Sequence, residues 1–232
     1  MRTLAVLSRK GGTGKTTVAV HMAVAAQAAG YKTIVADIDP QASACAWYGE
    51  RRKHTQTPEV TSVTTGALFT HRLAASRQGY DLMVIDTRPS TDMECIEAIR
   101  WADACLVVVR PCYFDLTAIV RTVELVTKMN KKAMFVINQA PSRRAGEEPK
   151  VILDTYQTLV EMGLPVAPVG LRYRAAFQNA VRYGKSVTEY DPESLAAFEM
   201  EGMWDWMAGE LWPHSVAQNG QGRDDDDLFM VS

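Results

Sequence analysis

The sequence predicts an α/β fold, doubly wound, with a mainly parallel sheet flanked by helices. Short apolar runs alternate with longer helical segments along the chain, and a glycine-rich loop joins the first run to the first helix. The 232 residues are 47% hydrophobic and 22% charged, which is ordinary for a soluble globular protein and excludes wholesale disorder. This length fits one domain, because hydrophobic cores usually stop growing near ~250–300 residues.

The first half of the chain alternates strands with helices. The first apolar run ends in glycines and suits a buried strand, and the Ala/Val-rich segment after it closes at Gly30, a natural helix C-cap. A second strand and helix follow, and Gly79 stops the next helix. The expected elements are strand 3–8, helix 15–29, strand 32–37, helix 41–52, helix 65–78, strand 81–86, helix 92–101 and strand 104–109.

The second half continues the alternation. Two prolines mark an edge strand, Gly184 stops a helix, and Asp191 and Pro192 are typical of the N-cap and first position of a last helix, which Pro213 ends. The expected elements are helix 116–130, strand 132–138, loop 139–148, helix 150–162, strand 166–170, helix 174–183 and a helix from 191. We expect one domain over residues 1–212 and a disordered acidic tail over 213–232.

The net charge of −2 hides an uneven distribution. Residues 110–185 contain 12 Lys and Arg against 6 Asp and Glu, whereas the last twenty residues have a balance of −3 because of four consecutive aspartates. A basic segment in a near-neutral chain indicates either a polyanion partner or simply a solvated face. Charge alone leaves both interpretations open.

The strongest motif is a phosphate-binding loop between the first strand and the first helix, the context that a P-loop requires. Glycines let the backbone approach phosphate closely, and the helix N-terminus adds positive potential. Lys15 is placed for the β- and γ-phosphates of a nucleotide, and the Thr16 hydroxyl for Mg²⁺. The alternative is a glycine-rich turn in which a lysine occurs by chance and no phosphate binds. The motif reads Lys10-Gly11-Gly12-Thr13-Gly14-Lys15-Thr16-Thr17.

This loop departs from the ordinary Walker A pattern, because Arg9 stands where the first glycine would fall. The second lysine at the start, Lys10, fits the deviant form instead, and here the chain resembles the ParA/MinD family of deviant-Walker ATPases. The resemblance implies ATP and Mg²⁺ as cofactors, and a homodimer that forms on ATP binding. It also implies that Lys10 reaches across that dimer to the partner's phosphates.

Two further segments are similar to the family's switch motifs. Asp37-Ile38-Asp39-Pro40-Gln41 resembles switch I, in which Asp39 positions the attacking water and the metal environment. Asp86 ends an apolar strand and looks like the Walker B aspartate, a metal-side residue. The family usually continues with two prolines, but this chain has Arg88 in place of one of them. That departure implies an altered switch II.

Asn138, at the end of a strand, resembles the family's adenine-contacting asparagine. An amide suits a base edge because it donates and accepts hydrogen bonds in one plane. An asparagine at that place is also ordinary turn chemistry.

Basic residues near the C-terminal helices bind DNA without sequence preference in members of this family. By resemblance the candidates here are Arg172, Arg174, Arg182 and Lys185. On a helix, Arg174, Arg182 and Lys185 would fall on one face, together with Gln178. No aromatic residues interleave them, which favours phosphate contact over base stacking; a plain solvated face is the alternative.

Two classes of function follow. The first is a cytoplasmic, nucleoid-associated positioning ATPase that partitions a plasmid, a chromosome or a protein cargo and is stimulated by a ParB-like adaptor. The second is a metabolic or redox enzyme on the same scaffold, of the ligase or iron–sulfur reductase type. The four cysteines match no cluster pattern and are expected in the core. A membrane partner is not expected, because anionic lipid would repel the acidic end of the chain.

Overall fold

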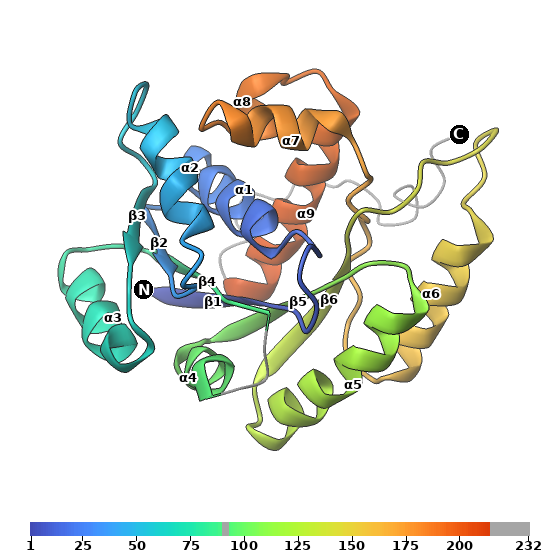
Figure 1. Ribbon diagram of the computed structural model, residues 1–232, viewed down its shortest axis with the longest axis horizontal. Coiled ribbons are helices and arrows are strands. Elements are labelled where there is room, and N and C mark those ends of the chain that lie inside the picture. The colour runs from blue at the N-terminus through green and yellow to red at the C-terminus, as the bar shows by residue number, and fades with distance from the viewer. Residues whose placement is uncertain (90–92, 214–232) are drawn as a thin grey trace.

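Six parallel strands form the central sheet of the structure, a computed structural model that describes residues 1–89 and 93–213 (Figure 1). Their order across the sheet is β3-β2-β4-β1-β5-β6, so most consecutive strands are joined by crossovers. The strands are β1 (Arg2–Leu7), β2 (Thr33–Asp37), β3 (Glu59–Ser62), β4 (Leu82–Asp86), β5 (Ala104–Val109) and β6 (Lys132–Ile137).

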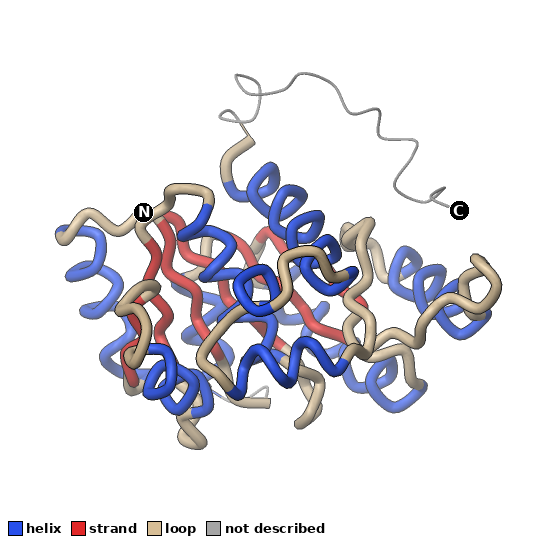
Figure 2. Tube along the Cα trace, turned by 90° about the horizontal axis from the view of Figure 1, so that it is seen from above, coloured by secondary structure: helices blue, strands red, loops and turns tan. Residues whose placement is uncertain are grey.

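Helices cover both faces of the sheet, as the second view shows (Figure 2). One face carries α1 and α9, with α2, α7 and α8 beside them; the other carries α3 to α6. The doubly wound prediction is therefore confirmed. The helices are α1 (Lys15–Ala28), α2 (Ser43–Arg51), the 3-10 turn η1 (Thr65–Ala67), α3 (Leu68–Arg77), α4 (Met93–Trp101), α5 (Tyr113–Lys128), α6 (Lys150–Glu161), α7 (Ala175–Arg182), α8 (Val187–Tyr190) and α9 (Leu195–Leu211).

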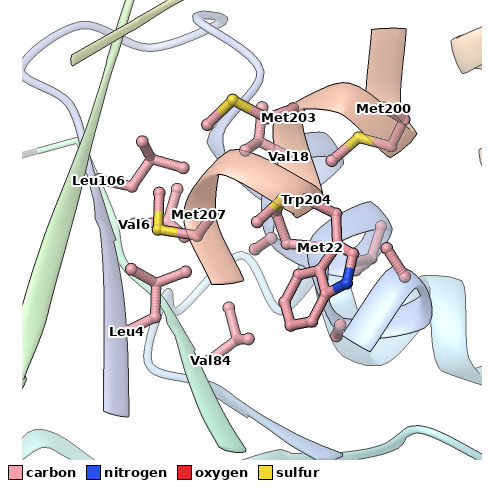
Figure 3. Close-up of a cluster of buried hydrophobic side chains, with 14 of the residues drawn as sticks. Leu4, Val6, Val18, Met22, Val84, Leu106, Met200, Met203, Trp204 and Met207 are labelled. Carbon is pink, nitrogen blue, oxygen red and sulfur yellow. The ribbon is translucent and has the colours of Figure 1, made fainter. Parts of the chain in front are cut away.

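Successive side chains of a strand point to opposite faces of the sheet, so each strand contributes to two hydrophobic cores, one on each face. Leu4 and Val6 point to the α1/α9 side, whereas Ala5 and Leu7 point to the opposite side. Methionines of α9 fill the first core at helical spacing, against β1 and β5 (Figure 3). Flexible thioether side chains suit the irregular gap between a helix and a twisted sheet. These cores hold the carboxyl ends of the strands in place.

The structure corrects several expected elements. β3 and α8 were not expected, and α5 begins three residues before the expected start at 116. The edge strand expected at 166–170 is reduced to isolated bridges, at Val166 with Phe135 and at Arg172 with Ala140. The last helix begins at Leu195, because the Ser194 hydroxyl accepts the Ala197 N–H as its N-cap, so the Asp191 cap is wrong. Residues 214–232 of the expected tail lie outside the described residues.

Arg51, at the end of α2, ties that helix to the α7–α8 segment. Its side chain is buried, and its guanidinium donates to the carbonyls of Thr57 and Gly184 and to both carboxylate oxygens of Glu189. Trp47 adds an indole N–H bond to the Lys185 carbonyl. The helix that follows the expected switch I is therefore fixed at its far end.

We expect Gly184→Ala to destabilise the protein far more than the matched variant Gly79→Ala. Both glycines have positive φ, 65° and 75°. A Cβ at position 184 would lie 2.2 Å from the Arg51 backbone nitrogen, whereas one at position 79 meets nothing within 4 Å. The left-handed backbone costs each variant about 1–2 kcal/mol, and the clash adds about 1–3 kcal/mol to the first. Urea denaturation would measure the difference, and equal losses of stability would contradict the close packing of α2 on this turn.

Candidate functional site

A cavity of about 670 Å³ opens at the carboxyl ends of the central strands, beside the N-terminus of α1. Ligands bind at this edge in open α/β sheets. The P-loop, switch I and the segment after β4 all contribute to its wall. The lining residues are Gly11, Gly12, Gly14, Lys15, Thr16, Thr17, Asp39, Pro40, Gln41, Ser43, Arg88 and Pro89.

The structure thus brings together most of the site residues expected from the sequence. Lys10, Asp86 and Asn138 lie outside the lining, and so does Thr13. Thr13 is buried and contributes to the loop's own hydrogen bonds instead.

Ser8, which sequence reasoning missed, organises the loop from within. Its hydroxyl accepts hydrogen bonds from Thr13 Oγ1 at 2.8 Å and Lys15 Nζ at 3.1 Å, and donates to the Lys10 carbonyl at 2.9 Å. A hydroxyl has one donor and two acceptor positions, so Ser8 uses its full capacity within the loop. A hydroxyl residue directly after the first strand was the available signal.

Lys15 is buried, with 6% of its surface exposed. Burial lowers the pKa of its ammonium, while Asp86 and Asp39 act to raise it. A cation held at the bottom of a cavity, among backbone amides at a helix N-terminus, suits an anionic ligand.

The carboxylate of Asp86 is buried, and neither of its oxygens has a hydrogen-bond partner among the described residues. Burial raises its pKa to about 7, with Asp37 and Asp39 adding to the shift. The Thr16 hydroxyl and Lys15 oppose it, although Thr16 lies outside hydrogen-bonding geometry. A divalent cation between Asp86 and Thr16 would supply the missing partner, so these residues fit Mg²⁺.

Asp37 has a different role from Asp86, although the two are register partners on β2 and β4. Its oxygens accept the backbone N–H groups of Asp39 and Cys45, at 3.2 and 3.0 Å, so it shapes switch I and caps α2. Asp39 is half-exposed at the cavity, and its Oδ1 accepts the Gln41 N–H at 2.9 Å.

Nucleotide-free Asp86→Asn should be more stable than wild type at pH 7–8 but not at pH 4. The folded-state pKa of about 7 exceeds the ordinary 3.8, so between these values the native state holds a proton that the unfolded state has released. The free energy of unfolding of the wild type therefore falls by roughly 2–4 kcal/mol as pH rises through this window. Urea titrations from pH 4 to 8 would measure this fall. Parallel profiles of stability against pH for wild type and Asp86→Asn would contradict the prediction. Asp37→Asn, as a control, should destabilise because that carboxylate accepts two amides.

Asn138 lies beneath the P-loop. Its Nδ2 donates to the Thr13 carbonyl at 2.7 Å, and Gln139 Nε2 donates to the Gly12 carbonyl at 2.8 Å. A Cβ at position 14 would lie 2.3 Å from Asn138 Nδ2, so only glycine fits there. One N–H of the amide is thus used by the loop, and the adenine contact stays a prediction.

The basic candidates are not gathered on one helical face, so that expectation is wrong. Arg174 is the N-cap of α7, and Lys185 lies beyond its end. Arg172 is paired with Glu148, and Arg174 with Glu199. Arg182 is exposed and Lys185 half-buried.

The fold and the site together define a P-loop ATPase of the deviant-Walker type. Residues 4–187 match the family described as CobQ/CobB/MinD/ParA nucleotide binding domain, and the chain belongs to this family. It is a ParA/MinD-type ATPase.

Two similar relatives are both called maintenance of carboxysome distribution protein A. The chain is 33% identical to that of Halothiobacillus neapolitanus over 84% of this chain and 90% of the relative. It is 31% identical to that of Gloeobacter kilaueensis, over 90% of this chain and 94% of the relative.

Solved structures show the same fold. An ATP complex of a Cyanothece McdA variant has a TM-score of 0.70 at 17% identity, over 91% of this chain and 96% of that one. MinD from Pyrococcus horikoshii with Mg-ADP also has a TM-score of 0.70, at 16% identity over 95% and 99% of the two chains. Within residues 1–89 and 93–213, no helix is both long and apolar enough to cross a membrane.

Proposed function

We propose that this chain is a positioning ATPase that dimerises around ATP, binds DNA without sequence preference in that state, and is released when an adaptor stimulates hydrolysis. The observation that carries this proposal is the placement of Lys10. Its side chain is exposed beside the cavity rather than lining it. A lysine so placed is available to the phosphates of a second copy.

The geometry of the site supports a set of roles within one subunit. Lys15 and the amides of the P-loop would hold the β- and γ-phosphates, and Thr16 and Asp86 would hold Mg²⁺, which would neutralise phosphate charge. Asp39 orients the attacking water at the open side of the cavity. Burial of the cavity floor strengthens each of these interactions relative to water.

For the cargo, we propose a large assembly whose distribution in the cell the ATPase maintains, because the similar relatives are named for carboxysome distribution. Plasmid or chromosome partition is the other candidate, since a chromosome-partitioning ATPase, Soj of Thermus thermophilus, is 27% identical over 51% of the chain. The ligase and iron–sulfur alternatives gain no support from the cysteines. Cys95 and Cys105 are buried core residues, whereas Cys45 is half-buried and Cys112 is exposed, so the expectation that all four lie in the core is wrong for these two.

The DNA surface we propose centres on Arg182 and Lys185. Arg172 and Arg174 would join it only by exchanging their glutamate partners for phosphates. A twofold dimer would double this surface into a longer patch.

ATP-loaded protein should bind duplex DNA of any sequence, and nucleotide-free protein should bind weakly. The double variant Arg182→Glu with Lys185→Glu should bind DNA with a weaker dependence on salt. The slope of log affinity against log salt concentration should decrease in magnitude by about 0.9 for each phosphate that the wild-type pair neutralises. Arg77→Glu, an exposed site at the end of α3, is the matched control and should leave the slope unchanged. Interferometry over a salt series would measure this. Absence of DNA binding by ATP-loaded wild type would refute the positioning function.

A further inference from the structure

The nucleotide cavity has a cationic side chain that the P-loop does not supply. Among the described residues that line it, two carry positive charge, Lys15 and Arg88. Lys15 lies in the buried floor, where it is held by Ser8. Arg88 is half-buried in the segment that follows β4. A triphosphate in this cavity would therefore meet positive charge from two separate elements.

The backbone before Arg88 is anchored to the sheet, and the residue after it passes close to the P-loop. Thr87 is buried, and its hydroxyl donates to the Val6 carbonyl of β1 at 2.7 Å. On the other side, Pro89 Cγ lies 4.0 Å from where a Cβ on Gly11 would be, so the segment passes directly against the P-loop. The Thr87 bond to β1 thus positions Arg88 at the cavity wall, beside the P-loop.

The position of Arg88 also selects which phosphate it meets. Asp86 and Thr16 form the edge of the site that fits Mg²⁺, and a metal held there would neutralise charge on the terminal phosphates of the nucleotide. Two residues of chain span at most about 7 Å, so the Arg88 backbone starts close to this edge. We therefore expect the terminal phosphate, rather than the nucleoside, on that side.

We propose that the Arg88 guanidinium binds the γ-phosphate of ATP in its own subunit, so that the site distinguishes ATP from ADP. The planar fork of N–H donors matches phosphate oxygens. In hydrolysis, the water oxygen bonds to the γ-phosphorus and the bond to the β–γ bridging oxygen breaks, with its electron pair left on ADP. One water proton stays on the phosphate and the other is released to solvent. Arg88 stabilises the charge that spreads over the γ-phosphate oxygens in this step.

The test compares equilibrium binding of a non-hydrolysable ATP analogue and of ADP, both with Mg²⁺, to wild type, Arg88→Ala and Arg88→Lys. For Arg88→Ala we expect affinity for the analogue to fall at least tenfold and affinity for ADP to change less than twofold. Arg88→Lys should recover part of the loss, because it keeps the charge without the fork. Single-turnover hydrolysis by Arg88→Ala should fall about 100-fold. Arg77→Ala is the control for removal of an exposed arginine.

An unchanged ratio of analogue to ADP affinity in Arg88→Ala would overturn the inference, whether both affinities stay the same or fall equally. Retained ADP binding shows at the same time that the variant is folded. The inference rests on ATP occupying the proposed site but not on DNA binding or cargo. If the wild-type protein hydrolyses ATP without binding DNA, the proposed positioning function is wrong but the proposed role of Arg88 is unaffected.

Discussion

Lys15→Ala should lose ATP binding by at least 100-fold, about 2.7 kcal/mol. The ammonium is buried in the cavity floor, where it donates to the Ser8 hydroxyl. Arg88, the other positive charge among the described lining residues, lies in the segment after β4 and does not replace the Lys15 charge on the cavity floor. Charge-assisted bonds to phosphate are among the strongest in proteins. Titration calorimetry with Mg²⁺ and ATP would measure the loss. If Lys15→Ala binds ATP with near-wild-type affinity, the P-loop assignment is wrong.

Lys10→Ala is the matched control, because it removes the other lysine of the same loop. Its side chain is exposed and lies outside the cavity lining. We expect each Lys10→Ala monomer to bind ATP almost normally but to form no dimer, as light scattering with a slowly hydrolysed analogue would show. A normal dimer would mean that Lys10 does not act on a second subunit.

The fold and the floor of the site could be predicted because their signals are local. The glycines, Lys15 and the following helix are contiguous, and Asp86 directly ends an apolar run. β3 gave no such signal: of its four residues only Val60 is buried, because the strand lies at the edge of the sheet beside β2. One buried residue establishes no period.

The basic surface could not be predicted, because its charges are cancelled by distant residues. Arg172 and Arg174 pair with Glu148 and Glu199, which lie 24 and 25 positions away along the chain. The sequence reports the charge of a side chain but not its partner. The same holds for Asn138, whose bond to Thr13 crosses 125 positions and depends on the pairing of β1 with β5 and of β5 with β6.

Asp39→Asn and Asp39→Ala should both bind ATP and dimerise, yet hydrolyse ATP at least about 100-fold more slowly than wild type, the contribution typical of a group that activates water. The carboxylate reaches the cavity from switch I, while Oδ1 holds the Gln41 N–H. Asparagine keeps an oxygen for that bond but loses the charge. Comparing the two variants therefore separates the shape of the loop from its chemistry.

If the negative charge of Asp39 orients water and metal, both variants slow hydrolysis to the same extent and accumulate as ATP dimers. If Asp39 only shapes switch I, Asp39→Asn turns over like wild type and Asp39→Ala does not. Single-turnover hydrolysis measured alongside dimer lifetime distinguishes these outcomes, and wild-type turnover by Asp39→Ala would exclude any catalytic part for the residue. Asp37 does not replace the lost charge, because its two oxygens are already held by the amides of Asp39 and Cys45.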